Sequence, residues 1–299
     1  MKNGNILPLK IMMGPDLKQC IVTFEDAVEY KKREKSVLKI LDKYPLARRI
    51  FEHSLTCPSF GIMYEGSNEL TAVDNLWNRH DIFHALTSLK YGLEITDVLD
   101  ESDYYMYIDE NLIPAITMAL LWHDTTRSVI EGTEHGSNIS LPQKHLRDIL
   151  TKCHSEGFVT LNDIERLIVR ALRCMVQHNR YDKCHLDAAI VRIAESIDVD
   201  VHRSYVSRLR SWKQLLDNNQ LTHVLGSAAI RRVLVSKNSN CKRPILITAM
   251  VDGKIEHWRK YNWFQIQERV KKKIESTGYG NLLRLKVDFH NGSKFYDFA

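Results

Sequence analysis

Apolar residues recur at every third or fourth position from about residue 25 to residue 217. This spacing places them on one face of an α-helix, so it predicts a helical body. The stretches that show it most clearly are 24–44, 78–95, 111–124, 161–178 and 185–201. Thr160 directly precedes one of these stretches and is predicted to be its N-cap, with acidic residues in the first turns.

The hydrophobic pattern changes near the C-terminus. Residues 228–238, 244–253 and 282–290 read as strands, whereas 263–276 reads as an amphipathic helix. The polar, turn-like stretch 216–220 separates the two patterns. We therefore expect a mainly α fold with two domains: a helical domain with an N-terminal helical extension at 1–220, and a small α+β domain at 221–299.

Composition narrows the class of protein. The chain has 299 residues, 44% hydrophobic and 26% charged, which is typical of a soluble globular protein. Its longest strongly apolar run, 114–122, is too short to cross a bilayer, and the N-terminus carries no secretory signal pattern. Six cysteines occur without a CxxC pair, which favours reduced thiols. These features predict a cytoplasmic protein that does not span a membrane.

The net charge of +5 favours partners that carry phosphate without requiring nucleic acid. The densest basic stretch, HRSYVSRLRSWK at 202–213, contains no acidic residue. A solvated helix face is the favoured interpretation of this stretch, and nucleic-acid binding is the less favoured one.

Histidines and carboxylates follow one another in a particular order along the helical region. His80 and His84 are one turn apart if NRHDIFH (78–84) is helical, and His123-Asp124 ends an apolar helix. Two more histidines and an acidic helix follow: His135 in a polar stretch, His178 at the end of another apolar helix, and Glu195 and Asp198 three residues apart. Neutral imidazoles and carboxylates together suit a divalent transition metal, so the ordered set predicts a metal centre.

Each member of this set also has a simpler interpretation. A single buried histidine is more often a hydrogen-bonded core residue than a ligand. Glu195 could form an ordinary ion pair with Arg192 on the preceding turn. The adjacent Cys184 and His185 are better explained as the start of a helix than as a zinc site, because no second cysteine lies nearby.

These motifs resemble the HD-domain superfamily of metal-dependent phosphohydrolases. The chain is most similar to the branch common in archaea, in which the HD domain carries a small C-terminal α+β domain. The resemblance rests on AVDNLWNRHDIFH (72–84), LLWHD (120–124), EHGSNIS (134–140), QHNR (177–180) and AAIVRIAESIDVDVHR (188–203). It continues more faintly in RPILITAMVDG (243–253) and WFQIQERVKKKIESTG (263–278).

The resemblance implies a helical HD-domain bundle and a set of metal ligands. His84, His123 and Asp124 match the first three ligands of the family, and Asp124 would also bridge to a second ion held by His135 and His178. The family's fourth ligand is an aspartate, and Glu195 stands in its place here. Asp198 matches a second acidic position of the branch and could take over that role. One or two divalent transition metals (Mn, Fe, Co, Ni or Zn) are implied.

The resemblance also implies residues that act on the substrate. His80 would protonate the leaving oxygen or hold the phosphate, whereas a hydrogen bond to Asp81 or Asp74 is its structural alternative. Arg127 follows HDTT, where many relatives have Gly followed by His or Lys, and it could clamp a phosphate or lie in a surface loop. Arg203 and His202 are weaker candidates for the same task.

The implied activity is hydrolysis of a phosphate mono- or diester of a nucleotide or similar small molecule by a metal-activated water. The alternative is an HD scaffold weakened in catalysis that binds a metal or nucleotide as a sensor, because the altered residue Glu195 is what loss of catalysis would produce. A small phosphorylated substrate is the expected partner, and a homodimer is compatible with such helical bodies.

Overall fold

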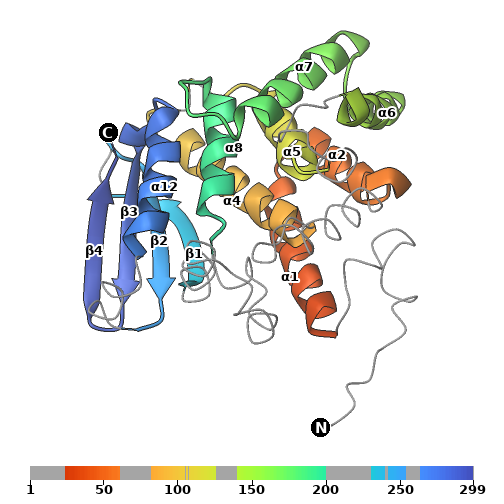
Figure 1. Cartoon of the computed structure of the whole chain (residues 1–299). Coiled ribbons are helices and arrows are strands. Elements are labelled where there is room, and N and C mark those ends of the chain that lie inside the picture. Colours follow the sequence, from red (N-terminus) through yellow and green to blue (C-terminus); the bar gives the residue numbers. More distant parts are fainter. Residues whose placement is uncertain are drawn as a thin grey trace.

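The computed structural model describes residues 24–60, 82–125 except 105 and 107, 140–199, 230–253 except 240 and 241, and 263–298. These residues form a mainly helical body with a small mixed sheet at one side of it (Figure 1). The predicted helical body with a C-terminal α+β part is therefore confirmed. The predicted boundary at 220/221 lies outside the described residues.

Seven helices of the described chain build the body. They are α1 (Phe24–Leu41), α2 (Pro45–Leu55), α4 (Ile82–Asp100), α5 (Leu112–Trp122), α6 (Ser140–Ser155), α7 (Leu161–Gln177) and α8 (Leu186–Ile197). Helix α4 is buried along nearly its whole length, because α1, α5 and α8 pack around it. Every residue of α5 is buried, so its apolar sequence faces protein on all sides.

Close packing between α4 and α5 depends on a glycine. A Cβ atom placed on Gly92 of α4 would lie 2.5 Å from Cδ1 of Leu120 and 3.3 Å from Cγ2 of Ile116, both in α5. Because a hydrogen replaces the side chain at this position, the two helices approach closely. This approach brings the start of α4 next to the end of α5, where the candidate site lies.

The C-terminal part contains a four-stranded sheet in the order β1-β2-β3-β4. Strands β1 (Ile230–Lys237) and β2 (Ile245–Val251) are antiparallel, β2 and β3 (Leu283–Phe289) are parallel, and β3 and β4 (Gly292–Asp297) are antiparallel. Helix α12 (Trp263–Ser276) connects the two parallel strands, and the short η5 (Gly280–Leu282) precedes β3. Strand β4 was not predicted from the sequence, because its side chains alternate between exposed and half-buried and include few apolar residues.

The sheet and α12 rest directly on the helical body. Tyr91 of α4 donates a hydrogen bond to the carbonyl of Val233 in β1, at 3.3 Å. Helix α12 packs against α8, and the Cys184 amide donates to the carbonyl of Thr277 at 3.3 Å (Figure 1). No helix in the described part of the chain is long and apolar enough to cross a membrane.

Candidate metal centre

Three side chains that are far apart in the sequence meet in the helical body. Nε2 of His84 lies 3.2 Å from Nε2 of His123. An oxygen of Asp124, Oδ2, lies 3.4 Å from each of these two nitrogens. All three residues are buried, with at most 2% of their surface exposed. The structure thus brings together His84, His123 and Asp124, the first three residues of the predicted ligand set.

The ends of two helices position these groups. His84 lies in the first turn of α4. Helix α5 ends at Trp122, so His123 is its C-cap and Asp124 begins the following turn, as predicted from the sequence. Trp122 fixes this end because it is fully buried and its indole N–H donates to Oγ of Ser54 in α2, at 3.0 Å. Since the helix stops there, two adjacent residues can face the same neighbour, which a continuing helix would not allow.

The hydrogen bonds of the two histidines determine which ring nitrogen keeps a lone pair. Nδ1 of His84 donates to Oδ2 of Asp198 at 2.5 Å, and Oγ of Ser88 lies 3.2 Å from the same nitrogen. Nδ1 of His123 donates to the carbonyl of Leu120 at 3.0 Å. Because carboxylates and carbonyls only accept hydrogen bonds, the protons sit on Nδ1 in both rings. When both rings are neutral, their Nε2 lone pairs therefore face each other and Asp124.

This arrangement fits a divalent transition metal. Two imidazole lone pairs and a carboxylate oxygen about 3.3 Å apart repel one another unless a proton or a metal ion lies between them. Ligand atoms bound to one ion at about 2.0–2.2 Å are separated by roughly 3.0–3.5 Å, which matches the three distances. In the described part of the chain, no other three metal-ligating side chains come together in this way. The group His84, His123 and Asp124 can hold a metal ion.

Charge at the centre also favours a cation. Burial acts to lower the pKa of His123, but the charge and hydrogen bond of Asp124, helped by the charge of Glu195, outweigh burial and raise this pKa. The surroundings of His123 therefore attract positive charge, whether a proton or a metal ion supplies it.

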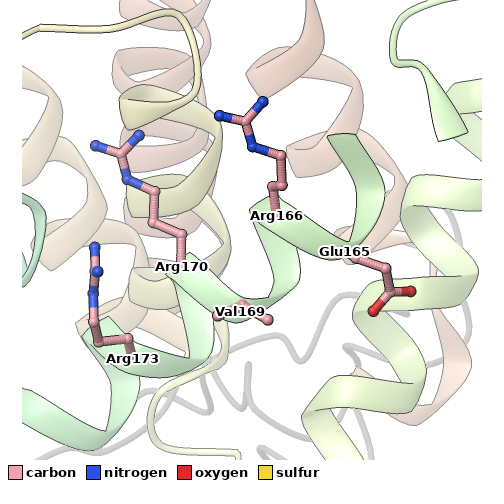
Figure 2. Close-up of a pocket in the computed structure, with 5 residues that line it drawn as sticks. All are labelled: Glu165, Arg166, Val169, Arg170 and Arg173. Carbon is pink, nitrogen blue, oxygen red and sulfur yellow. The ribbon is translucent and has the colours of Figure 1, made fainter. Parts of the chain in front are cut away.

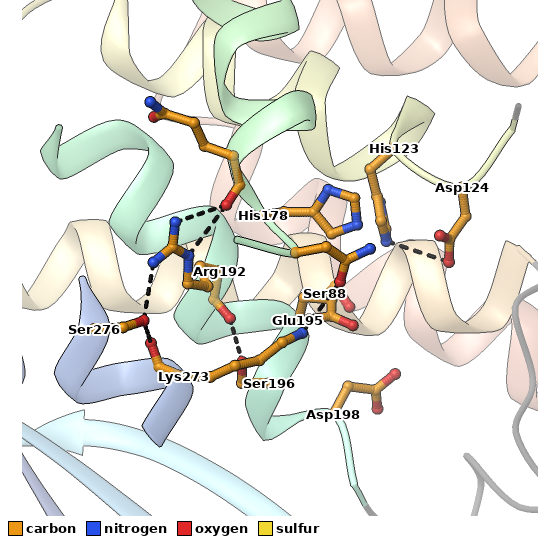
Figure 3. Close-up of polar contacts among 12 residues, drawn as sticks. Ser88, His123, Asp124, His178, Arg192, Glu195, Ser196, Asp198, Lys273 and Ser276 are labelled. Atoms are coloured by element: carbon orange, nitrogen blue, oxygen red, sulfur yellow. Dashed lines mark hydrogen bonds and ion pairs between the residues drawn. The ribbon is translucent and has the colours of Figure 1, made fainter. Parts of the chain in front are cut away.

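His178 stands beside this group. It is the C-cap of α7, as its place after an apolar helix predicted, and its ring meets that of His123 edge-on with centroids 5.1 Å apart (Figure 3). Its Nδ1 donates to the carbonyl of Met175 at 2.5 Å. Burial, together with the neighbouring His123, lowers the pKa of His178 to about 4, so the ring is neutral near pH 7.

The two acidic candidates have separate partners. Helix α8 ends at Ile197, before the end of the helical stretch predicted at 185–201, and Asp198 is its C-cap. Asp198 binds Nδ1 of His84, on the side of the ring opposite the converging lone pairs. In this position Asp198 orients the His84 ring, which is a role that carboxylates often have beside metal-binding histidines.

Glu195 lies close to His178 and forms an ion pair with Lys273 of α12 (Figure 3). Its Oε2 accepts a hydrogen bond from Nζ of Lys273 at 2.6 Å, and Nζ also lies 3.3 Å from Oδ1 of Asn179. Burial would raise the pKa of Glu195, but the charge of Lys273, with His178 and His123, lowers it to about 2. The alternative pairing of Glu195 with Arg192 is wrong, because Arg192 binds Asp182 and two backbone carbonyls instead.

The position of Lys273 beside the candidate site was not predicted from the sequence. Lys273 belongs to a run of three lysines on an amphipathic helix, where exposure is the ordinary expectation. Only the packing of α12 on α8 distinguishes it, since Lys271 and Lys272 are exposed whereas Lys273 is 5% exposed. The Cys184-His185 pair is at a helix start, as expected: His185 is the N-cap of α8 and Cys184 is a free thiol.

Several predicted residues lie outside the described part of the chain. These are His80, Arg127, His135, His202 and Arg203, together with the whole basic stretch 202–213. The roles predicted for them in binding phosphate, in protonating a leaving group, in holding a second ion or in binding nucleic acid stay predictions.

A row of arginines on α7 forms a shallow depression on the surface, lined by Arg166, Arg170 and Arg173 with Glu165 and Val169 (Figure 2). Ion pairs neutralise these arginines. Arg170 and Arg173 both bind the buried carboxylate of Asp187, at 2.8 and 2.5 Å, and Arg166 lies 3.7 Å from Asp163. Because acidic partners balance the charge, the depression is not a second candidate site for phosphate.

Comparison of the chain with protein-family models, with curated proteins and with solved structures gave no match. The resemblance to HD-domain phosphohydrolases therefore stays a prediction from the motifs. The buried group of His84, His123 and Asp124 stands on its own geometry.

Proposed function

We propose that this chain is a metal-dependent phosphohydrolase with an HD-type helical bundle, acting on a phosphate mono- or diester of a nucleotide or similar small molecule. The observation that carries the proposal is the convergence of two imidazole lone pairs and one carboxylate at His84, His123 and Asp124. The order of these residues along the chain supports the HD assignment, and the net charge of +5 is compatible with a phosphorylated substrate.

Each residue has a defined part in this proposal. His84, His123 and Asp124 would hold a divalent ion, and Asp198 would keep the His84 ring in the orientation that presents Nε2. Such an ion, when bound, acidifies a water toward neutrality and offsets the charge of phosphoryl oxygens. His80 is proposed to protonate the leaving oxygen or to hold the phosphate, and Arg127 and Arg203 to bind phosphoryl oxygens through their guanidinium groups.

The metal content of the purified protein tests the proposal. We expect one or two equivalents of Mn, Fe, Co, Ni or Zn in the wild type by mass spectrometry. The His123→Ala variant should lose both the metal and hydrolysis in a screen of nucleotides, while circular dichroism shows that its fold is retained. Full hydrolytic activity in this variant would rule out the centre.

A non-catalytic sensor is the second candidate function. The ion pair between Glu195 and Lys273 favours this second candidate. Glu195 stands at the position of the family's fourth ligand, and in the ion pair it is not free to bind a metal. The two candidates differ in one measurement. A sensor would bind metal and nucleotide without hydrolysing any nucleotide in the screen, whereas an enzyme would release phosphate or a nucleoside monophosphate.

A further inference from the structure

Lys273 is the one basic side chain that the C-terminal domain inserts beside the candidate centre within the described part of the chain. Its side chain is 7% exposed, and its ammonium group lies between Oε2 of Glu195 at 2.6 Å and Oδ1 of Asn179 at 3.3 Å. Asn179 directly follows His178, and the carboxylate of Glu195 interacts electrostatically with both His178 and His123. The ammonium therefore belongs to the same charged cluster as the centre (Figure 3).

A buried ion pair of this kind contributes little to folding as such. The cost of removing two charges from water usually offsets their attraction, and apolar side chains of similar size often replace such a pair without loss. The neighbouring Lys271 and Lys272 stay exposed on the same helix. The position of Lys273 is therefore better explained by the charge of the cluster than by the stability of the fold.

The ammonium of Lys273 changes the charge that a metal ion would meet at the centre. It offsets the carboxylate of Glu195, its partner at 2.6 Å, so this carboxylate is not available to balance an ion. A second divalent ion near Glu195 and His178 would lie close to the ammonium, and like charges in a buried site repel each other strongly. The pairing of Lys273 with Glu195 therefore favours a single ion at His84, His123 and Asp124.

On this basis, we infer that Lys273 is a counter-ion that keeps Glu195 in an ion pair, so that Glu195 does not bind the metal. This pairing limits the centre to a single ion, held by His84, His123 and Asp124. The inference rests on the proposed metal centre and deepens it. It assigns the C-terminal domain a part in setting how many ions the helical body holds. Lys273 is a positioning residue here, because it acts through Glu195 rather than on the substrate.

A double-mutant cycle on Glu195 and Lys273 tests the inference, with Mn²⁺ or Zn²⁺ affinity and stoichiometry measured by calorimetry and mass spectrometry on the full chain. The wild type should bind one ion. Glu195→Gln leaves the ammonium unpaired and should weaken binding about tenfold, whereas Lys273→Met frees the carboxylate and should strengthen it about tenfold or admit a second ion. The double variant Glu195→Gln/Lys273→Met restores the net charge and should bind one ion within about threefold of the wild type.

The double variant decides between a counter-ion and a ligand. If Glu195 ligates the metal, the double variant binds as poorly as Glu195→Gln alone, and the inference is overturned while the centre stands. Two ions in the wild type overturn it as well. If the wild type takes up no ion, the centre itself fails and the inference fails with it. Lys272→Met is the matched control, one residue earlier on the same helix and exposed, and should leave binding unchanged.

Discussion

At the scale of single residues, Asp198 and Glu195 show how position decides the role of a carboxylate. Asp198 lies 2.5 Å from Nδ1 of His84 and so determines which nitrogen of this ring is protonated. Glu195 lies three residues earlier, where it meets a lysine from another domain. The same functional group orients an imidazole ring in one place and neutralises an ammonium in the other.

The role of Asp198 gives a testable prediction. Asp198→Asn keeps a hydrogen-bond acceptor but removes the charge that makes the His84 imidazole a stronger donor to metal, so metal affinity should fall about 10–100-fold. Calorimetric titration with Zn²⁺ measures the change. Ser88→Ala removes an uncharged neighbour of the same nitrogen and should have a smaller effect. Complete loss of metal, as expected for His123→Ala, would instead indicate that Asp198 is itself a ligand. Unchanged affinity would show that Asp198 does not orient His84 for metal binding.

At the scale of elements, a buried aspartate joins two helices that form one side of the site. Asp187 in the first turn of α8 is 1% exposed and accepts hydrogen bonds from Arg170 and Arg173 of α7. Its Oδ1 also accepts from the amide of Ala188 at 2.8 Å. Because α7 carries His178 and α8 carries Glu195, this contact sets the distance between two residues of the candidate site.

Asp187 should make the fold sensitive to acid. Burial acts to raise its pKa, but the hydrogen bonds from Arg170, from the Ala188 amide and from Arg173 together lower it below the ordinary value of 3.8. A lowered pKa in the folded state means that the stabilisation is complete above the unfolded-state pKa and is lost as pH falls through the folded-state pKa.

Urea denaturation of Asp187→Asn checks this expectation. Removing the charge should lower the free energy of unfolding by roughly 3 kcal/mol near pH 7, since two arginines lose a buried partner. The difference from the wild type should shrink below about pH 4, because the Asp187 carboxylate of the unfolded chain takes up a proton there, and it should be lost as pH falls through the lowered folded-state pKa. A difference that is the same near pH 7 and near pH 3 would show that packing, not charge, is the cause.

At the scale of the whole molecule, Arg192 joins the helical body to the C-terminal domain. Its side chain is fully buried in α8 and donates to the carbonyls of Gln177 and Asp182, each at 2.7 Å. Its Nη1 also donates to Oγ of Ser276 in α12 at 3.0 Å. The Arg192 guanidinium group thus donates hydrogen bonds both to carbonyl groups of the connection between α7 and α8 and to α12, the helix that carries Lys273.

Arg192→Met should destabilise the whole molecule. The variant fills a similar volume but leaves two buried carbonyl groups without this donor, so we expect the free energy of unfolding to fall by about 2–4 kcal/mol in urea denaturation. Arg166→Met on the exposed face of α7 is the control, with an expected change within about 0.5 kcal/mol. Equal stability of the two variants would mean that Arg192 does not join the domains as described.

The sequence by itself determined the elements with a regular pattern and the first three residues of the site. Its helical spacing predicted α1, α4, α5, α7 and α8, and its alternating stretches predicted β1, β2 and β3. His123 and Asp124 were identifiable because an apolar helix visibly ends before them, and a helix end depends on local sequence. The order of histidines and carboxylates along the chain included His84, and the resemblance to a family then implied that these three residues are ligands of one ion.

Only the tertiary structure decided what these residues meet. No spacing in the chain shows that Asp198 turns to Nδ1 of His84, or that Glu195 chooses Lys273 rather than Arg192, because these partners come from elements 78 or more residues away. Local patterns record which face of a helix is apolar, whereas the pairing of buried charges depends on how faces from distant segments pack. The sequence therefore determined which residues can bind a metal. The docking of α12 on α8 determined which charged side chains lie around them.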